Sequence, residues 1–445
     1  MLVLKFGGTS VGNPQRMKAL SKLILSDQKR IVVLSAVSGT TNALVEIASL
    51  LTAQRKQEAA YKISTLHNQY KNFVEELYTS PSSKEKGHGL VKHHFEFIES
   101  FVQDMFTSHE ERAILAQGEL LSTALFHFYL EECGVNSVLL PALEFMRIDE
   151  NNEPILSYIE EQVRLQLDKH PTTDLFITQG YICRNNYGEI DNLKRGGSDY
   201  TASLIGAAVR AQEVQIWTDI DGMHNNDPRI VANTRPIAEL SFDEAAELAY
   251  FGAKILHPSS VLPAQKYSIP VRLLNTMQPE AKGTLITDIT AGAQIKSIAA
   301  KDDIIAIKIK SSRMLMAYGF LRSVFEVFER YKTPIDMITT SEVALSLTID
   351  NPTHLENIIE ELNQFGTVTV DTEQTIVCIV GDLLQDKPGY AAKVFTALKN
   401  IPIRMISYGG SKNNVSVLIH QSHKKEALNA LNEGLFQSAL NAQLS

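Results

Sequence analysis

Short apolar runs alternate with amphipathic stretches through the first half of the chain. The runs have the length of buried strands and stand at residues 2–6 (LVLKF), 31–37 (IVVLSAV), 174–180 (DLFITQG) and 214–219 (VQIWTD). Apolar residues recur at helical spacing over 112–132 and 200–211. Strands that alternate with helices predict an α/β fold with a doubly wound, mainly parallel sheet. Ligands of such sheets bind at the carboxyl ends of the strands, and here the glycine-rich and polar motifs follow strands.

The last third of the chain contains an internal repeat. Gly319-Phe320 opens a helix that leads into PIDMIT (334–339), and Gly389-Tyr390 opens another that leads into PIRMIS (402–407). Each copy reads strand, helix, strand, strand, helix, and a last strand at 367–373 completes only the first. The second copy ends near residue 434 and would leave a sheet edge unpaired. We therefore predict that residues 295–303 supply its fourth strand.

Residues 46–105 have a mostly helical pattern and carry no chemistry that we can identify, so we interpret them as a helical excursion beside the substrate pocket. The histidines of this region and just beyond, His88, His93, His94 and His109, are predicted to be solvated. The chain has no HExxH and no GxSxG motif, which removes support for a metalloprotease or a nucleophilic hydrolase. We predict no protein metal site.

The composition limits which classes of protein this chain can belong to. The 445 residues allow two to four domains, and 44% hydrophobic with 21% charged residues is typical of a globular protein. A net charge of −9 argues against nucleic acid or an anionic membrane as partner. The scattered Cys133, Cys183 and Cys378 indicate free thiols in a reducing cytosol, and neither a signal peptide nor an apolar membrane span is expected.

Two glycine-rich turns carry candidate chemistry. Lys5 ends a strand just before Gly7 and Gly8, and such a loop lets phosphate approach backbone N–H groups and a helix start. In residues 194–201 (KRGGSDYT), Ser198 and Asp199 stand at the expected N-cap of a second helix. The guanidinium of Arg195 could form two parallel hydrogen bonds with a carboxylate. Taken alone, the first motif is better explained as a turn with a snorkelling lysine and the second as a capped helix, but two glycine-rich turns that each carry a cation make coincidence less likely.

Three further segments are candidates with ordinary structural explanations beside them. TDIDGMHNNDPR (218–229) follows a strand, although Asp-Gly and Asp-Pro are common turn signals. Lys254 in FGAKILHP is a second candidate phosphate clamp or an exposed helical lysine. Glu119 in QGELLST is expected to open the helical run from Leu120, where the helix dipole favours a carboxylate in any case.

Six motifs stand together in one order: KFGGTSVG (5–12), SGTTN (38–42), QGELLS (117–122), RGGSDYTA (195–202), TDIDG…DPR (218–229) and FGAKILHP (251–258). This set resembles the aspartokinase family, and the resemblance is thinnest over 50–105. It implies an amino-acid kinase catalytic domain at 1–290 and two α+β, ferredoxin-like ACT regulatory domains at 304–374 and 375–445, the second completed by 295–303. The implied reaction is ATP plus L-aspartate to ADP plus 4-phospho-L-aspartate, the first step of the lysine, threonine and methionine branch.

The resemblance also implies roles for single residues. Lys5 and Lys254 would neutralise the γ- and β-phosphates of ATP, and Asp199 would orient these two lysines. Arg195, Glu119, Thr41 and Ser198 would hold aspartate. ATP would be bound by Lys5, Gly7, Gly8, Thr218, Asp219, His224, Arg229 and Lys254. His224 departs from the family, which often has Tyr there. An acceptor carboxylate needs no strong general base, and Mg²⁺ would bridge the phosphates with few protein ligands.

Regulation is the last implication of the resemblance. The motif ITTSE (338–342) resembles an inhibitor-binding signature, and the expected effector residues are Met314, Gly319, Phe320, Leu321, Asp336, Thr340, Ser341 and Glu342. Asp336 as counter-charge to a distant ammonium favours lysine over threonine as feedback inhibitor, unless it caps a turn or pairs with a neighbouring cation. Paired ACT domains imply a homodimer or a dimer of dimers, in the cytoplasm. The alternatives are a glutamate or acetylglutamate kinase and an inactive amino-acid sensor.

Overall fold

The chain forms two compact units in a computed structural model that describes residues 1–103, 106–193, 196–252, 256–288, 295–311, 318–382 and 389–437. The N-terminal unit comprises Met1–Met223, Ala238–Phe242 and Ile255–Thr290, and the C-terminal unit comprises His224–Ile237, Asp243–Lys254 and Ala291–Ser445. The N-terminal unit differs from the predicted catalytic domain at 1–290, because residues 224–237 and 243–254 belong to the C-terminal unit. One contact within that unit is the hydrogen bond from Asn226 Nδ2 to Leu428 O at 3.1 Å. The three domain boundaries stay a prediction.

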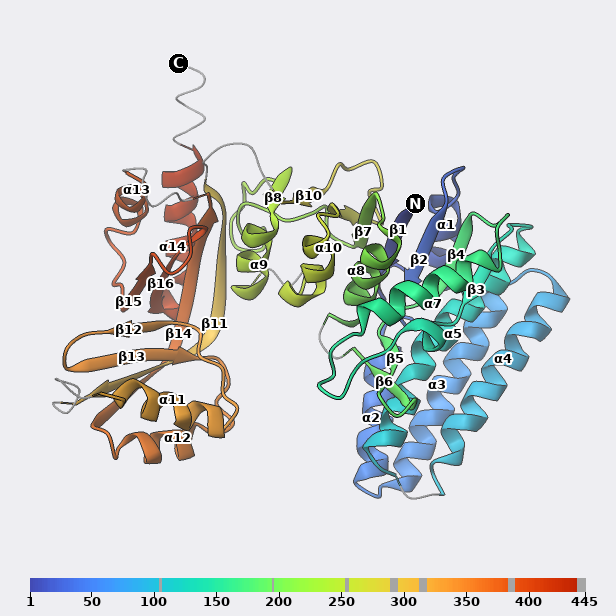
Figure 1. Cartoon of the computed structure of the whole chain (residues 1–445), viewed down its shortest axis with the longest axis horizontal. Coiled ribbons are helices and arrows are strands. Elements are labelled where there is room, and N and C mark those ends of the chain that lie inside the picture. The colour runs from blue at the N-terminus through green and yellow to red at the C-terminus, as the bar shows by residue number, and fades with distance from the viewer. Residues whose placement is uncertain are drawn as a thin grey trace, which may run out of the picture. The chain divides into compact units, whose positions relative to one another are not determined.

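The N-terminal unit is built on a mainly parallel sheet (Figure 1). Within the described residues it has eight strands in the order β3-β4-β2-β1-β7-β9-β10-β8, and β9 with β10 is its antiparallel pair. The strands are β1 (Leu2–Phe6), β2 (Arg30–Leu34), β3 (Val138–Leu140), β4 (Leu175–Gln179), β7 (Glu213–Thr218), β8 (Glu239–Ser241), β9 (Val271–Asn275) and β10 (Thr284–Thr287). β2 and β4 are buried along their whole length, as expected for strands covered on both faces, so the predicted fold class is confirmed.

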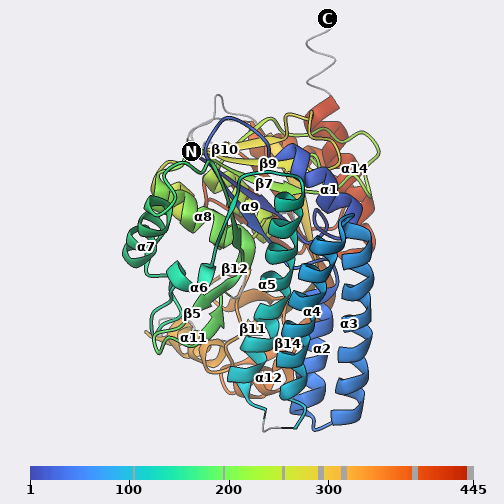
Figure 2. The ribbon, with the colours of Figure 1, turned by 90° about the vertical axis from the view of Figure 1, so that its right-hand side faces the viewer.

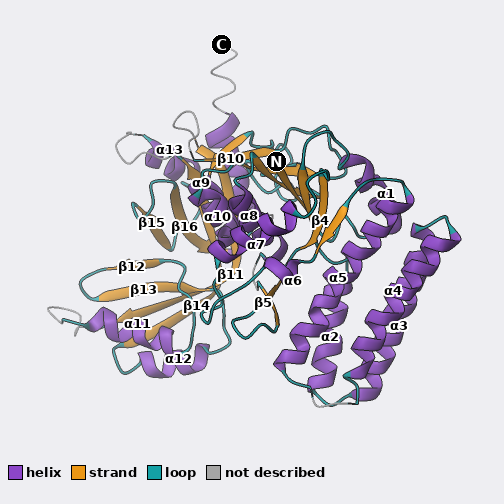
Figure 3. Ribbon diagram, turned by 45° about the vertical axis from the view of Figure 1, so that its right-hand side comes forward, coloured by secondary structure: helices purple, strands orange, loops and turns teal. Residues whose placement is uncertain are grey.

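Helices cover this sheet and extend from it. They are α1 (Pro14–Leu23), α2 (Thr40–Thr52), α3 (Lys56–Leu77), α4 (Pro81–Ser100), α5 (Ser108–Glu132), α6 (Ala142–Phe145), α7 (Leu156–Asp168), α8 (Gly197–Val209) and α10 (Leu262–Lys266). The long helices α2 to α5 run side by side (Figures 2 and 3). Ile63, Val74 and Phe95 are fully buried among them. The described part of the stretch 46–105, residues 46–103, is mostly helical as predicted. A short hairpin, β5 (Ile182–Arg184) and β6 (Ile190–Asn192), stands apart from the main sheet.

The C-terminal unit holds a second sheet of six strands within the described residues, in the order β12-β13-β11-β14-β16-β15. Its strands are β11 (Ile295–Lys310), β12 (Ile338–Thr340), β13 (Ala344–Ile349), β14 (Thr367–Gly381), β15 (Met405–Tyr408) and β16 (Asn414–His420). The two long strands are antiparallel and serve both repeats. Ile304–Lys310 pairs with Thr367–Gln374, and Ile295–Lys301 pairs with Ile376–Gly381, the first strand of the second repeat. The edge of that strand is thus paired by residues from before the first repeat.

Each repeat packs two helices on its own part of this sheet (Figure 1). The helices are α11 (Phe320–Arg330) and α12 (Leu355–Leu362) in the first repeat, and α13 (Tyr390–Ala397) and α14 (Lys424–Asn432) in the second. Two separate hydrophobic clusters result, one around Ile307 and Phe328 and one around Val377 and Leu428. α9 (Phe242–Tyr250) belongs to this unit from Asp243 onward. Among the described residues no helix is both long and apolar enough to cross a membrane.

Candidate active site

Four neighbouring parallel strands end at the same edge of the N-terminal sheet. In the order β4-β2-β1-β7 they are followed by Gly180, Ser35, Gly7 and Asp219. Backbone contacts join these loops directly: Gly180 N donates to Leu34 O at 2.9 Å, and Gly7 N donates to Trp217 O at 3.4 Å. The structure therefore brings several of the predicted motifs to one place, although some of them, such as Gly7 and Asp219, lie more than two hundred residues apart in sequence.

The ammonium of Lys5 is held by a carboxylate at this edge. Lys5 Nζ lies 2.7 Å from Asp199 Oδ1, and the two side chains are 11% and 15% exposed. Asp199 stands in the first turn of α8, where the helix dipole favours a negative charge. The N-cap position is occupied by Gly196 (φ +69°), so the expectation that Ser198 and Asp199 cap this helix is wrong. A largely buried ammonium fixed in this way is ready to meet a further anion.

Glycines keep the space around this ammonium open. A Cβ atom at Gly7 would lie 3.3 Å from Lys5 Nζ, and one at Gly8 would lie 3.1 Å from Ala36 O. A Cβ atom at Gly180 would lie 2.4 Å from Ser198 Cβ, closer than real side chains approach. Ser198 is held on its other side by Ser35, whose Oγ donates to Ser198 Oγ at 2.9 Å. The glycines thus allow loops and helix starts to converge on Lys5.

Glu119 is a buried carboxyl group in the interior of α5. It does not open a helix, because α5 begins at Ser108 and a capping box of Thr107 and Glu110 fixes that start. Its side chain accepts from Ala36 N at 3.2 Å through Oε1, while Oε2 is buried and has no hydrogen-bond partner among the described residues. Burial raises the pKa of Glu119 to about 8. Such a group gains most from an added cation, since a cation would stabilise its charged form.

Thr41 lies in the first turn of α2 and is half-buried. Its neighbour Thr40 shares a hydrogen bond of 2.9 Å with the hydroxyl of Tyr70, which comes from α3. A cavity of about 450 Å³ opens here and is lined by residues such as Ser38, Gly39, Thr40 and Tyr70. The helical excursion therefore forms one wall of a cavity beside the loop that leads into α2.

Sequence reasoning missed three residues of this region: Ser35, Tyr70 and Tyr181. Tyr181 follows Gly180 with a left-handed backbone (φ +67°), which is strained for a tyrosine and frequent at functional sites. Its ring lies against α8, where a Cβ atom at Gly197 would be 2.4 Å from Tyr181 Cδ2. Burial, with the charge of Glu119 adding to it, raises the pKa of Tyr181 to about 12. Its position directly after the predicted strand 174–180 was the available signal.

The predicted nucleotide residues divide between the two units. In the N-terminal unit, Thr218 ends β7 and its Oγ1 accepts from Ile220 N at 3.1 Å, while Asp219 next to it is exposed. In the C-terminal unit, His224 is half-buried and its Nδ1 lies 3.1 Å from Thr234 Oγ1. Arg229 forms a forked pair with Asp227 at 2.9 and 2.8 Å, and this pair holds the pKa of Asp227 below its usual value. The nucleotide contacts of all four residues stay predictions.

Arg195, Lys254 and Met314 lie outside the described residues. Of the histidines, His94 is not simply solvated: it is half-buried, and its Nδ1 lies 2.6 Å from Gln117 Oε1. His88 lies 2.6 Å from Glu75, and His109 lies 3.5 Å from Glu189. Over the part of the chain that the structure describes, no group of three His, Cys, Asp or Glu side chains could hold a metal ion. Cys133, Cys183 and Cys378 are free thiols.

The sequence of this chain matches known protein families and individual proteins. The model of the amino acid kinase family matches residues 1–275, and a model of the ACT domain matches residues 377–435. Lysine-sensitive aspartokinase 3 of Escherichia coli (strain K12) is 34% identical, over 98% of this chain and 99% of that protein. Chloroplastic aspartokinase 3 of Arabidopsis thaliana is also 34% identical, over 98% of this chain and 82% of that protein. This chain belongs to the aspartokinase family.

Solved aspartokinases share the fold over nearly the whole chain. E. coli aspartokinase III in complex with aspartate and ADP superposes with a TM-score of 0.84, at 34% identity over 98% of this chain and 100% of that chain. The complex of that enzyme with lysine and aspartate gives a TM-score of 0.82, over 98% of this chain and 99% of that chain. As an aspartokinase, the chain is an ATP-dependent kinase that phosphorylates aspartate.

The predicted effector residues fall in two places on the first repeat of this aspartokinase. Gly319 (φ +85°) and Phe320 begin α11 and line a cavity of about 390 Å³ together with Tyr318 and Phe365, and Leu321 is exposed beside them. Asp336 precedes β12, which ends at Thr340, and the exposed Ser341 and Glu342 follow in a tight turn. In that turn Ser341 Oγ accepts from Ala344 N at 3.1 Å.

Proposed function

We propose that the carboxyl edge of the N-terminal sheet transfers the γ-phosphoryl group of ATP to the side-chain carboxylate of L-aspartate, giving 4-phospho-L-aspartate. The observation that supports this best is the Lys5–Asp199 pair beside the glycine loop, at 2.7 Å. Phosphoryl transfer passes through a loose transition state, so catalysis depends on positioned positive charge more than on covalent help. Lys5 supplies that charge, Lys254 adds to it, and Asp199 keeps Lys5 in place.

Aspartate is held by groups of both signs in this proposal. Glu119 takes the α-ammonium: its unpaired, buried Oε2 gains a partner, and the ionised form becomes favoured. Arg195 takes the α-carboxylate, because a guanidinium matches it with a fork of two hydrogen bonds. Thr41 and Ser198 complete the pocket, and Ser198 is already fixed by Ser35. The side-chain carboxylate then attacks without a general base.

ATP is bound at the loops after β1 and β7 in this proposal. Gly7 and Gly8 let the phosphates approach the backbone, while Thr218, Asp219, His224, Arg229 and Lys254 add contacts. Mg²⁺ neutralises phosphate charge when it is bound. The residues present fit this role, because Mg²⁺ in kinases is held mainly by substrate phosphates and water with one or two carboxylates, and Asp219 is an exposed carboxylate at this edge.

Lysine is the feedback inhibitor in this proposal, acting on the first ACT repeat. A related enzyme, E. coli aspartokinase 3, is named as lysine-sensitive. Asp336 offers a carboxylate for an ε-ammonium, although here it already pairs with the ammonium of Lys301 at 2.7 Å. The other contacts would come from Met314, Gly319, Phe320, Leu321, Thr340, Ser341 and Glu342. The reaction would then be the first step of the lysine, threonine and methionine branch.

A homodimer or a dimer of dimers in the cytoplasm completes this proposal, and exposed apolar side chains of the second sheet support the association. The outer strands β12 and β15 of the six-stranded sheet carry Ile338, Ile406 and Tyr408 at 42–44% exposure. An apolar strand edge that pairs with no further strand among the described residues favours association with another sheet. Sedimentation of the full chain with and without lysine measures the assembly.

The reaction is tested by a hydroxamate assay with ATP, Mg²⁺ and one acceptor at a time. We expect a product with L-aspartate and at most a trace with L-glutamate or N-acetyl-L-glutamate. The acetylated compound lacks the ammonium that Glu119 would bind. Turnover of glutamate or acetylglutamate instead would indicate another amino-acid kinase, and no turnover of any acceptor by folded protein would indicate a sensor without catalysis.

A further inference from the structure

An ion pair outside the proposed pocket connects α5, the helix that carries Glu119, with the β5–β6 hairpin, which is bonded to Tyr181 beside the start of α8. Arg112 Nη1 donates to Asp191 Oδ2 at 2.6 Å, and the Asp191 side chain is only 2% exposed. We propose that Arg112 and Asp191 are positioning residues for aspartate: their pair holds the two sides of the amino-acid pocket at the correct separation. This inference rests on the proposed function, because it takes Glu119 and Ser198 as residues that hold the substrate.

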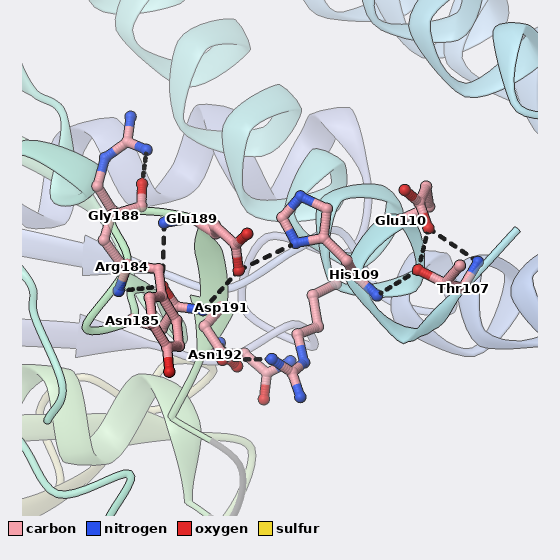
Figure 4. Close-up of polar contacts among 11 residues, drawn as sticks. Thr107, His109, Glu110, Arg184, Asn185, Gly188, Glu189, Asp191 and Asn192 are labelled. Atoms are coloured by element: carbon pink, nitrogen blue, oxygen red, sulfur yellow. Dashed lines mark hydrogen bonds and ion pairs between the residues drawn. The ribbon is translucent and has the colours of Figure 1, made fainter. Parts of the chain in front are cut away.

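One end of the pair is rigidly related to Glu119. Arg112 and Glu119 stand seven residues apart on α5, close to two helical turns, so their side chains leave the same face of the helix. The start of α5 is set just before Arg112 by the capping box of Thr107 and Glu110 (Figure 4). A shift of Arg112 along α5 would therefore move Glu119 with it.

The other end of the pair lies on β6, one of the two strands of the β5–β6 hairpin. Asp191 lies opposite Cys183 in the hairpin, and its Oδ1 accepts from Asn192 N at 2.8 Å. Two residues later, Leu193 N donates to Tyr181 O at 2.8 Å, and Tyr181 N donates to Thr201 Oγ1 of α8 at 2.9 Å. The hairpin is thus connected through Tyr181 to α8, whose first turn carries Ser198.

The burial of Asp191 makes the pair strong. A carboxylate with 2% exposure is costly unless it is paired, and Arg112 satisfies it with a charge-assisted hydrogen bond. A second, weaker link lies on the surface beside it, where His109 Nδ1 is 3.5 Å from Glu189 Oε2 (Figure 4). Both contacts join the first turns of α5 to β6 or its preceding turn. The buried pair is therefore the stronger of these two contacts between the helix and the hairpin.

The test compares steady-state kinetics of Arg112→Met, Asp191→Asn and the double variant in the full chain. We expect the KM for aspartate to rise about tenfold in each single variant, with the KM for ATP unchanged and kcat reduced less than threefold. The double variant should resemble either single variant, because both changes break the same contact. Arg112→Lys, which keeps a positive charge, should recover part of the loss.

The matched control is the ion pair of Arg272 and Glu213 in the same unit. Arg272 Nη2 lies 2.9 Å from Glu213 Oε2, with the side chains 31% and 17% exposed, but this pair stands near the amino ends of β9 and β7, away from the site. Arg272→Met should lower thermal stability about as much as Arg112→Met and leave the KM for aspartate unchanged. Asp191→Asn keeps the size of the buried side chain, and Arg112 is 35% exposed, so at least one variant should fold.

Glu119→Gln separates the two ways in which the inference can fail. If Glu119→Gln raises the KM for aspartate while Arg112→Met behaves like Arg272→Met, the positioning role is wrong and the proposed pocket stands. If Glu119→Gln leaves the KM for aspartate unchanged, the assignment of the pocket is wrong and the positioning role fails with it. A selective rise in both variants supports the inference.

Discussion

The ammonium of Lys301 lies 2.7 Å from Asp336 Oδ1 and 3.0 Å from Asp350 Oδ2. Burial works against the charge of Lys301, but the two carboxylates outweigh it and raise its pKa. Tyr250 OH also donates to Asp336 Oδ1 at 2.8 Å, while Asp336 Oδ2 is buried without a hydrogen-bond partner among the described residues. The carboxylate proposed to bind the effector's ammonium is thus already occupied by an ammonium of the chain itself.

Removal of Lys301 should therefore sensitise the enzyme to lysine. In Lys301→Met the effector no longer competes with an internal ammonium for Asp336, and we expect half-inhibition at about tenfold lower lysine, a change of ~1.4 kcal/mol. Lys424→Met is the matched control, because Lys424 is equally buried in the same unit and pairs with Asp302. Inhibition curves give the result, and equal curves for both variants would show that Lys301 does not compete with the effector.

Loss of the Asp336 carboxylate should weaken inhibition by lysine. Asp336→Asn removes the charge that would hold an effector ammonium, so we expect the lysine concentration for half-inhibition to rise at least tenfold with basal activity within twofold of wild type. Ser341→Phe, which fills the neighbouring turn, should also relieve inhibition. Threonine serves as the comparison effector. If threonine inhibits the wild type and millimolar lysine does not, the assignment of Asp336 is wrong.

The raised pKa of Glu119 predicts how aspartate binding depends on pH. With a pKa near 8 the free carboxyl group is mostly protonated at pH 7, so binding of an ammonium must release its proton. We expect kcat/KM for aspartate to rise with pH up to about 8 and the KM for ATP to stay level. In Glu119→Gln, kcat/KM should be lower at every pH and the rise should disappear. A rise that persists in this variant would belong to another group.

The same group affects stability. Its pKa is raised from 4.5 to about 8 on folding, so between these values the folded chain holds a proton that the unfolded chain has lost. Folding stability therefore declines as pH rises through this window, at most on the order of 5 kcal/mol in total. Melting curves of wild type should fall between pH 5 and 8 more steeply than those of Glu119→Gln.

The Gly180→Ala variant tests how closely the loop after β4 must approach the first turn of α8. Alanine there would place its Cβ 2.4 Å from Ser198 Cβ and 2.8 Å from Ser198 Cα, which pushes the first turn of α8, with Asp199, away from Lys5. We expect kcat to drop at least a hundredfold and stability to drop by about 1–3 kcal/mol. Gly89→Ala is the control, because no atom lies within 4 Å of a Cβ at that position. Normal kcat in Gly180→Ala would show that Ser198 and Asp199 tolerate displacement.

The fold was predictable where a single period dominates the sequence. The predicted strands 2–6, 31–37 and 174–180 each contain a short apolar core, and the repeat of Gly319-Phe320 with Gly389-Tyr390 revealed two matching modules. β3, β5, β6 and β8 have only three residues each, too few for any period to show. The two compact units were not predictable, because the packing of 224–237 depends on long-range contacts such as Asn226 with Leu428.

The residues of the site were likewise predictable only where a local sequence pattern marks them. Lys5 and Asp199 were found because glycines and charged residues mark turns after strands, and the structure pairs them across 194 positions of sequence. Tyr70, Arg112 and Ser35 gave no signal, since a tyrosine or an arginine within a helix and a serine just after a strand are all ordinary. Their importance arises from tertiary contacts, as in the hydrogen bond of Tyr70 with Thr40.

The most direct measurement is the turnover of Lys5→Ala with L-aspartate, ATP and Mg²⁺. Loss of the positioned ammonium should reduce kcat at least a thousandfold, roughly 4 kcal/mol of transition-state stabilisation, while circular dichroism shows a folded chain. Lys22→Ala, a change of an exposed lysine in the last turn of α1, should keep full activity. Near-normal kcat with unchanged KM for ATP in Lys5→Ala would contradict the proposed role of the Lys5–Asp199 pair.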